Sequence, residues 1–382
     1  MNSLEARTII RQLSSQAVTV LENKEEILPF THLDKKRFGV ISVGKQNAQP
    51  FVKRLQEYAP IENISRLNTQ STDKEIKGIV DVISHSTQTI IAIFSDKKEE
   101  IQLAEKILKK ATGKVLVFFT SPYSIPKYEE LTAEAEAIIV AYENNPVMQE
   151  CAAEVLFGGT SADGKLPVST GKYPQGSGIF IPECRLGHAF PEEVDMDSRI
   201  LSRIDSIVQE GIDSMAFPGC QIIITRHKKI IYDRAFGYFD YEKKRPVSTN
   251  DLYDLASITK AMGTLPAIMW LNDHEQVSLN APLCFYLPEM RDYGLSAITL
   301  RQTLMHESGL PAGISLRRLL IDPDSYSAPL LKRGRDSEYP IQVDKDWFVQ
   351  KDCRLKPWLF HNKTLLPLAH RRGTIRLAFT PR

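Results

Sequence analysis

Hydrophobic residues divide the first half of the chain into two kinds of segment. Residues 37–44 (RFGVISVG), 88–95 (QTIIAIFS) and 114–121 (KVLVFFTS) are short apolar runs between polar flanks. Such runs are typical of strands buried on both faces of a mostly parallel sheet. A further strand is predicted at 136–142, and helices are predicted near 48–58, 73–83, 98–111 and 146–156. The alternation predicts an open, mostly parallel α/β domain with helices on both sides of the sheet.

A helix is also predicted at the start of the chain, because apolar residues recur there at helical spacing on one face. These residues are Ala6, Ile9, Ile10, Leu13, Ala17 and Leu21.

A second region follows residues 171–193, which are rich in Gly and Pro and predict a linker or a segment that wraps over the first domain. Residues 198–215 have the apolar spacing of an amphipathic helix. Residues 219–227 and 229–240 read as two strands close enough to form a hairpin. A long apolar helix that begins at Ser257 is predicted next.

Ser257 begins the motif Ser-x-x-Lys, which places a serine and a lysine on one face of a helix. The motif alone is not specific, because it occurs at Ser42, Ser71, Ser95, Ser124, Ser169 and Ser257. A serine hydroxyl is a poor nucleophile until a base removes its proton. Lys260 can be that base where a dry setting keeps its amine neutral, and the apolar residues after Lys260 are expected to supply that setting. The alternative is that Ser257 caps the helix and Lys260 is solvated.

The bulk composition is that of a globular protein of two or three domains. The chain has 382 residues, of which 42% are hydrophobic and 25% charged, and its net charge of +1 provides no overall basic field for nucleic acid. The five cysteines and eight histidines lack the spacing of a disulfide framework or a metal site, and no cofactor is indicated. No apolar run is long enough to span a membrane. The N-terminus lacks the apolar core of a signal peptide, so the chain as written is expected to be cytoplasmic.

Residues 353–382 differ from the rest of the chain. They contain no Asp or Glu but seven Lys and Arg residues. A basic tail of this kind can be an arm that binds nucleic acid or anionic lipid. It can also be disordered or the product of a shifted reading frame. Trp358, Phe360 and leucines without a clear period are not typical of a solvated arm.

Residues 1–185 resemble the C-terminal α/β domain of glycoside hydrolase family 3, in its β-N-acetylglucosaminidase branch. The resemblance rests on residues 14–30 (SSQAVTVLENKEEILPF), on 37–44 and on 141–169, a segment with Gly-Lys-Leu-Pro-Val near its end. The family's catalytic groups in this branch lie on a preceding (β/α)8 barrel. These 382 residues contain no such barrel, and no pair of carboxylates suited to glycoside cleavage is marked among them. The resemblance therefore implies an accessory domain.

Residues from about 191 to 352 resemble the serine β-lactamase family, close to the class C enzymes and the related esterases and penicillin-binding proteins. The resemblance rests on residues 217–240, 252–262 (LYDLASITKAM) and 300–314 (LRQTLMHESGLPAGI). It implies that Ser257 is the nucleophile and Lys260 the base. His306 is expected to serve packing and a turn, and Gly309 a turn that needs a positive φ.

Two motifs that complete this family's site on the C-terminal side of the nucleophile are missing after Ser257. None of the tyrosines after Ser257 is followed two residues later by asparagine, and Lys363-Thr364 is followed by Leu365 instead of glycine. The predicted organisation is an α/β domain (1–185), a partial α+β serine β-lactamase/transpeptidase-like domain (186–352) and a basic tail (353–382). The chain is expected to be a fragment of a larger, extracytoplasmic protein.

The expected function is that of an impaired serine hydrolase joined to a glycosidase accessory domain. Its partner would be a small ester, amide, β-lactam-like or cell-wall-derived substrate, and no nucleic acid. The alternative is a non-catalytic remnant of a β-N-acetylglucosaminidase that binds carbohydrate or protein.

Overall fold

The structure is a computed structural model that describes residues 3–61, 63–288, 291, 297–310, 331–344 and 346–349. The predicted tail, residues 353–382, lies outside the described residues. The chain forms two compact units, Met1–Asp251 and Leu252–Arg382, and each is considered by itself. The first unit extends past residue 185, where the first family resemblance ends, and that family boundary stays a prediction.

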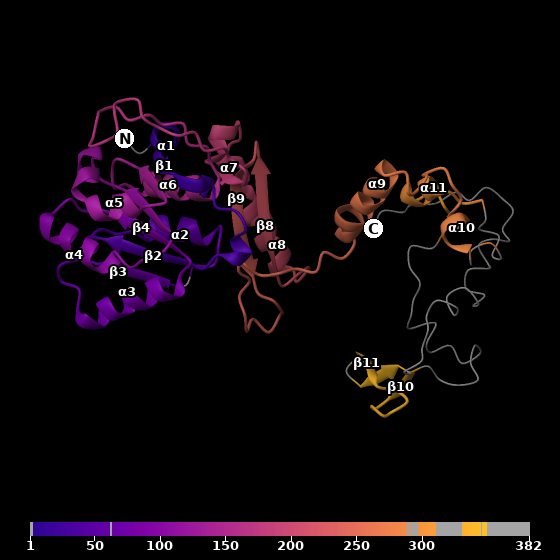
Figure 1. The fold of residues 1–382 in the computed structure, drawn as a ribbon. Helices are drawn as coiled ribbons and strands as arrows, with labels where there is room; N and C mark the ends of the chain where they lie inside the picture. Colours follow the sequence, from indigo (N-terminus) through magenta and orange to yellow (C-terminus); the bar gives the residue numbers. More distant parts are fainter. Residues whose placement is uncertain are drawn as a thin grey trace. The chain divides into compact units, whose positions relative to one another are not determined.

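A six-stranded sheet forms the centre of the first unit, in the order β1-β6-β5-β4-β2-β3 (Figure 1). Neighbouring strands are parallel except for β1, which pairs antiparallel with β6. The predicted mostly parallel α/β sheet is confirmed. The two edge strands, β1 and β3, were not predicted. The strands are β1 (Thr19–Asn23), β2 (Phe38–Val43), β3 (Asn63–Leu67), β4 (Gln88–Ile93), β5 (Lys114–Phe118) and β6 (Ala137–Val140).

Helices cover both faces of this sheet, and their ends follow from local sequence. Thr72 and Glu75 form a reciprocal capping box at the start of α3. The Asn145 side chain accepts the N–H of Met148 at the start of α6, and Gly158, with φ +71°, ends that helix. The helices are α1 (Leu4–Ala17), α2 (Gln49–Gln56), α3 (Asp73–His85), α4 (Lys98–Leu108), α5 (Glu129–Glu134) and α6 (Pro146–Phe157), with short 3-10 helices η1 (Lys24–Glu26), η2 (Leu33–Lys35) and η3 (Pro122–Lys127).

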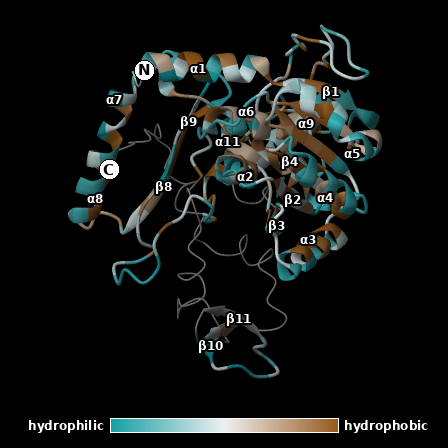
Figure 2. Cartoon of the chain, turned by 90° about the vertical axis from the view of Figure 1, so that its left-hand side faces the viewer, coloured by the Kyte–Doolittle hydropathy of each residue, from teal (hydrophilic) through white to brown (hydrophobic). Residues whose placement is uncertain are grey.

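The central strands are buried on both faces, as predicted. Successive side chains of a strand point to opposite faces, so Ile90 of β4 packs with α2 and α6 while Ile91 packs with α3 and α4. All six residues of β4 are buried. Figure 2 shows the hydrophobic character of these strands between more polar helices. The sheet therefore separates two hydrophobic cores.

The first helix is present, but it does not bury the predicted face. Ile9, Ile10 and Leu13 are exposed, whereas Arg11 and Ser14 are buried. Helical spacing identifies an apolar face but not the side of the helix that meets the rest of the protein. The side of this helix that meets the rest of the protein is the one that carries Arg11, whose ion pairs are described below.

The Gly- and Pro-rich segment after α6 wraps over the first domain. The N–H of Ile179 donates to the carbonyl of Val20 at 2.7 Å, and Ala162 and Ile181 exchange two main-chain hydrogen bonds. Cys184 and Arg185 both donate their N–H groups to the carbonyl of Gly158. Of the two predicted alternatives, linker and wrapping segment, the structure shows the second.

A second, smaller sheet completes the first unit. The predicted hairpin is confirmed as β8 and β9, which pair antiparallel, and β7 adds to β9 in parallel. Helices α7 and α8 pack against one face of this sheet, around a small core that includes Leu201, Ile231 and Tyr232. The elements are β7 (Gly187–His188), η4 (Pro191–Val194), α7 (Ser198–Leu201), α8 (Arg203–Asp213), β8 (Gly219–Arg226) and β9 (Lys229–Gly237).

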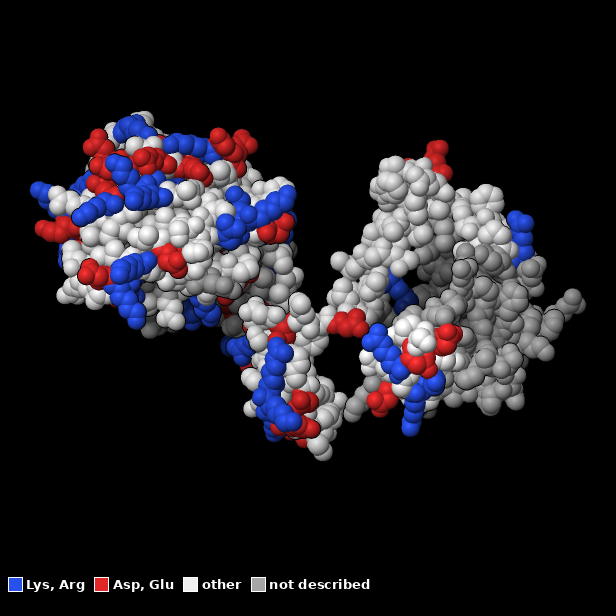
Figure 3. All heavy atoms as spheres, turned by 60° about the horizontal axis from the view of Figure 1, so that its bottom comes forward, with Lys and Arg blue, Asp and Glu red and all other residues white. Residues whose placement is uncertain are grey.

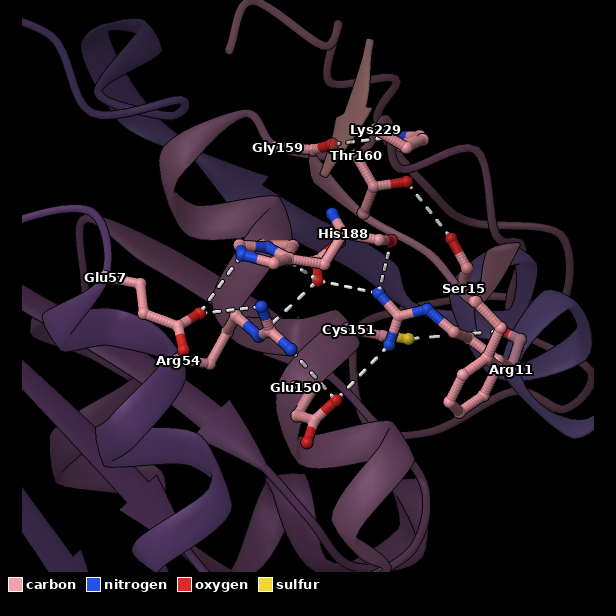
Figure 4. Close-up of polar contacts among 12 residues, drawn as sticks. Arg11, Ser15, Arg54, Glu57, Glu150, Cys151, Gly159, Thr160, His188 and Lys229 are labelled. Atoms are coloured by element: carbon pink, nitrogen blue, oxygen red, sulfur yellow. Dashed lines mark hydrogen bonds and ion pairs between the residues drawn. The ribbon is translucent and has the colours of Figure 1, made fainter. Parts of the chain in front are cut away.

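A cluster of charged side chains joins α1, α2, α6 and β7 (Figure 4). Arg11 Nη2 donates to Glu154 Oε1 and to the main-chain oxygen of His188, both at 2.7 Å, and Nη1 donates to Glu150 at 3.3 Å. The Arg11 and Glu154 side chains are only 6% and 2% exposed. We refer to the following residues as the Arg11 cluster: Arg11, Arg54, Glu57, Glu150, Glu154, His188 and Glu193.

Burial perturbs the titration of His188 within this cluster. Its Nε2 lies 3.3 Å from Glu57 Oε2. Burial and the nearby positive charges of Arg54 and Arg11 lower the pKa of His188 to about 3. The imidazole is therefore neutral in the folded protein at pH values where an exposed histidine is charged.

The second unit contains short elements. In its described part they are a π-helical segment η5 (Lys260–Thr264), α9 (Leu265–Asp273), α10 (Leu283–Tyr286), α11 (Leu300–Leu304), β10 (Leu331–Arg333), β11 (Ile341–Asp344) and β12 (Trp347–Val349). The three strands form an antiparallel sheet in the order β10-β12-β11. Among the residues of this unit whose side chains the structure describes, Leu283 is the one buried hydrophobic residue.

The surface in the view of Figure 3 carries both signs of charge, with Lys and Arg interspersed among Asp and Glu. Within the described ranges, no helix combines the length and the apolar character that crossing a membrane requires.

The first prediction concerns the Arg11–Glu154 pair. Arg11→Ala leaves the buried carboxylate of Glu154 without its main partner, so we expect a loss of about 3–5 kcal/mol in the free energy of unfolding. Arg199→Ala is the control, because the Arg199–Asp197 pair lies on the surface with the arginine side chain 88% exposed, and we expect no measurable change there. Urea unfolding followed by circular dichroism measures both variants. Equal stability of the two variants would contradict the assigned role of Arg11.

The second prediction concerns His188 and pH. Because folding lowers the pKa of His188, the unfolded chain binds the extra proton below pH 6.5, and stability falls as the pH falls from 6.5 toward 3. Between pH 7.5 and 5.5 this group alone removes about 1.4 kcal/mol of stability. Burial raises the pKa of Glu57, which acts in the opposite direction at lower pH, so the comparison stops at pH 5.5.

His188→Gln removes the titrating ring and keeps polar atoms in its place. We expect this variant to lose about 1.4 kcal/mol less than the wild type between the two pH values. Urea unfolding at pH 7.5 and 5.5 gives both differences. If the wild type and the variant lose the same stability, His188 is not buried in its neutral form.

Candidate active site

Ser257 and Lys260 contact each other in the structure. Lys260 Nζ donates a hydrogen bond to Ser257 Oγ at 3.1 Å. The two residues lie at the start of the helical stretch that leads into α9, three positions apart, so their side chains reach each other without any distant element. The structure thus brings together the two residues that the sequence singled out.

The other five Ser-x-x-Lys copies do not have this contact. All of them lie among the described residues, and in each one the serine hydroxyl bonds to a main-chain group. The bonds are Ser42 to Ser65 O, Ser71 to Asn68 N, Ser95 to Lys97 N, Ser124 to Ser121 O and Ser169 to Gln175 N. Only in the Ser257 copy does the lysine at the fourth position bond to the serine. The contact therefore separates copies that the motif could not.

The helix that Ser257 was predicted to begin has an irregular first turn. The N–H groups of Ile258, Thr259 and Lys260 each donate to the carbonyl three residues back, at 2.8, 3.2 and 3.0 Å. Lys260 then begins the π-helical segment, and Leu265 donates to its carbonyl. π-helical turns inside longer helices are frequent at functional sites.

In the part of the chain that the structure describes, no dry setting surrounds Lys260, which corrects the prediction. Ser257 and Lys260 are both exposed. Met262, Leu265 and Met269 are exposed as well, and no residue of η5 or α9 is buried. Sequence hydrophobicity shows that a helix has apolar side chains to bury, but it does not supply the surface that would cover them.

The His306–Gly309 stretch forms a turn after α11. Thr299 and Gln302 make a capping box at the start of that short helix. His306 has φ +58° and Gly309 has φ +70°. The positive φ predicted for Gly309 is confirmed.

Tyr286 is one of the tyrosines after Ser257, and it does not supply the missing Tyr-x-Asn motif. Tyr286 accepts the N–H of Ser278 at 2.6 Å, a local contact within one loop. Tyr293, Tyr326 and residues 363–365 lie outside the described residues.

No metal site is evident in the part of the chain that the structure describes, where no three His, Cys, Asp or Glu residues are grouped to hold an ion.

Comparison with known proteins places this site in a family. Residues 204–339 match the family model described as "Beta-lactamase", a range that includes Ser257 and Lys260. This part of the chain is a β-lactamase family domain. The match begins in α8 of the first unit and ends in the second unit, before β11.

Two curated relatives match this chain over stretches of similar length. "Esterase EstB" of Burkholderia gladioli is 33% identical over 125 residues, which is 31% of this chain and 32% of that protein. "Protein flp" of Staphylococcus aureus (strain NCTC 8325 / PS 47) is 31% identical over 116 residues, 30% of this chain and 23% of that protein. The chain thus spans a third or less of the length of these relatives.

Among solved structures, one similar protein is a glycoside hydrolase family 3 β-N-acetylglucosaminidase from Paenibacillus sp. str. FPU-7. Its TM-score is 0.36 at 17% identity, over 45% of this chain and 33% of that chain.

Proposed function

We propose that the β-lactamase family domain is a serine acyl hydrolase in which Ser257 is the nucleophile and Lys260 the base. The observation that carries the proposal is the 3.1 Å contact between Lys260 Nζ and Ser257 Oγ, which the other five Ser-x-x-Lys copies lack. The proposed substrate class is a small ester or amide, including β-lactam-like and cell-wall-derived compounds. The similarity to "Esterase EstB" supports an ester.

The proposed reaction has two steps. A neutral Lys260 amine accepts the Ser257 hydroxyl proton as Oγ attacks the acyl carbonyl carbon, which gives a tetrahedral oxyanion. The oxyanion collapses, the bond to the alcohol or amine breaks, and Lys260 returns the proton to that leaving group. Water then attacks the Ser257 ester, which releases the acid and restores the hydroxyl.

The oxyanion needs hydrogen-bond donors that are in place before it forms. The N–H groups of Ile258, Thr259 and Lys260 already donate to main-chain carbonyls. At the start of this helix, we therefore assign the role of oxyanion donor to the N–H of Ser257.

We further propose that catalysis is impaired. General-base action requires a lysine that has lost its proton and its water, and Lys260 is exposed. No Tyr-x-Asn motif follows Ser257 in the sequence. Both observations favour slow acylation of Ser257.

The third prediction tests the nucleophile with a fluorophosphonate and a fluorescent penicillin. We expect slow covalent labelling of the wild type, no labelling of Ser257→Ala, and a decrease of about 100-fold or more in the labelling rate of Lys260→Met. In-gel fluorescence gives the rates, and peptide mass spectrometry locates the modified residue.

Ser169→Ala is the matched control, because Ser169 is another exposed serine of the same motif and bonds to a main-chain N–H. Its labelling should equal that of the wild type. Labelling that persists in Ser257→Ala would refute the assignment of the nucleophile. Rapid, stoichiometric labelling of the wild type would refute the impairment alone.

A second candidate function is a non-catalytic module that binds carbohydrate or protein. The observation that favours it is the distribution of the core. Among the side chains that the structure describes, every buried hydrophobic residue apart from Leu283 lies in the first unit. The first unit thus has a hydrophobic core of its own, with which it can fold whether or not the serine site is active.

The fourth prediction follows from this candidate. Leu252 is 96% exposed at the start of the second unit, so limited chymotrypsin digestion should leave a stable fragment that ends near Asp251. Mass spectrometry of the fragment locates its end. A resistant fragment that still contains residues 331–349 would instead favour a folded hydrolase domain.

A further inference from the structure

The edge strand β3 leaves main-chain groups unpaired along its outer side. In the described part of the first unit, β2 is its one strand neighbour. The N–H of Gly44, directly after β2, donates to the Leu67 carbonyl at 2.8 Å, so Leu67 points its main-chain groups toward β2. The N–H and C=O of one strand residue point to one side of the strand, and those of the next residue point to the other. Ile64 and Arg66 therefore direct their N–H and C=O groups away from the sheet.

The side chains of the same two residues lie beside a groove. Ile64 and Arg66 are the register partners of Val40 and Ser42 in β2, and Val40 packs in the core on the α2 side of the sheet. A groove of about 530 Å³ on that side is lined by these four residues and by Val52 of α2, among others. Ile64 is 44% exposed. A strand added next to β3 would therefore place every second side chain at this groove.

Arg66 gives this edge a positive charge without a counter-charge. Arg66 is exposed, and no carboxylate among the described residues lies within ion-pair distance of its guanidinium. Glu75 also lines the groove, but its carboxylate accepts hydrogen bonds from the N–H and the hydroxyl of Thr72 at 2.7 and 3.0 Å. A charged side chain on an edge strand discourages unselective pairing. Arg66 therefore favours a strand that carries an acid opposite it.

We propose that β3 docks an extended peptide segment of a partner protein, which joins the sheet with an acidic residue opposite Arg66 and an aliphatic residue opposite Ile64. Main-chain hydrogen bonds supply affinity in this kind of strand addition, and alternate side chains supply specificity. In antiparallel pairing, the slightly more stable arrangement, the partner sequence reads acidic-x-aliphatic from its N- to its C-terminus. The surface lies in the first unit, so the inference does not depend on the proposed reaction at Ser257.

A second copy of the chain is a less favourable occupant. If two β3 strands paired antiparallel around Ser65, Ile64 of one copy would lie opposite Arg66 of the other, and neither arginine would meet an acid. The two guanidiniums would instead be diagonal neighbours on one face of the joined sheet, where like charges repel each other. A partner strand with an acid removes this repulsion.

The fifth prediction concerns the binding of short peptides to the full chain. The probe is a fluorescein-labelled peptide, Thr-Thr-Glu-Thr-Ile-Thr-Thr, and the comparison peptide has Lys in place of Glu. We expect the glutamate peptide to bind about tenfold more tightly than the lysine peptide, because its carboxylate meets Arg66. Fluorescence anisotropy measures both dissociation constants. Ser257→Ala should bind the glutamate peptide as the wild type does, because the serine site plays no part.

An exchange of charges tests whether Arg66 is the contact. Arg66→Glu should reverse the preference, so that the lysine peptide binds about tenfold more tightly than the glutamate peptide. Arg203→Ala is the control, because Arg203 is another exposed arginine of the first unit, at the start of α8, and both dissociation constants should stay unchanged. Circular dichroism checks that each variant keeps the fold of the wild type.

Methylation of single peptide nitrogens tests the main-chain hydrogen bonds without any change to the protein. In the antiparallel register, the N–H groups of the peptide's Glu and Ile donate to the carbonyls of Arg66 and Ile64, while the N–H of the threonine between them points away. Methylation of the Glu or the Ile nitrogen should weaken binding about tenfold. Methylation of the middle threonine nitrogen should weaken it by less than about threefold.

The docking role of β3 is overturned if the glutamate peptide does not bind, if Arg66→Glu leaves the preference unchanged, or if the three methylated peptides bind alike. Tighter binding of a peptide with the reversed order, Ile-Thr-Glu, would overturn the antiparallel register. Analytical ultracentrifugation of the free chain tests the other occupant. A dimer that the glutamate peptide dissociates would identify a second copy as the occupant and overturn the proposal.

Discussion

The buried contact between Arg11 and Glu154 is the constraint on which the arrangement of the first unit depends. Taking a guanidinium and a carboxylate out of water is costly unless both are fully coordinated. Arg11 meets that condition only where α1, α6 and the main chain of β7 come together. The contact also sets the rotation of α1. With Arg11 inward, Ile9 and Leu13 must face outward, so a polar contact overrides the apolar face of this helix.

In the first unit, the sequence predicted the strands that are buried on both faces and missed those at the edges of the sheet. The central strands β2, β4, β5 and β6 were predicted because strands buried on both faces are apolar at every position, and β4 is buried throughout. The edge strand β3 is only partly buried, so its sequence, Asn-Ile-Ser-Arg-Leu, has no continuous apolar run. For α1 the helix was predicted correctly and its buried face was not, because ion pairs between residues more than 130 positions apart leave no local pattern.

At the candidate site, the sequence predicted the residue pair and the structure supplied the geometry. Family resemblance selected Ser257 among six copies of one motif, and the hydrogen bond from Lys260 is the physical difference between that copy and the others. The prediction of an apolar setting around Lys260 was wrong, because such a setting requires distant segments of the chain to cover the apolar residues of this helix. The hydrogen bond from the N–H of Ala256 to Asp254 Oδ1 was not predicted, although an aspartate two residues before a turn position is a common way to hold a turn.

The β-lactamase family region is divided unequally between the two units. Its first part has a core around Ile231 and Tyr232 and gains β7 as a strand partner. Its second part, in the described residues, leaves Met262, Met269 and Trp270 exposed. Each such side chain contributes on the order of 1.5–3 kcal/mol when it is fully buried. The same burial would remove water from Lys260, which lies on the segment that carries these residues. A surface that covered these apolar side chains would thus also shield Lys260 from water, so both effects depend on the same covering segment.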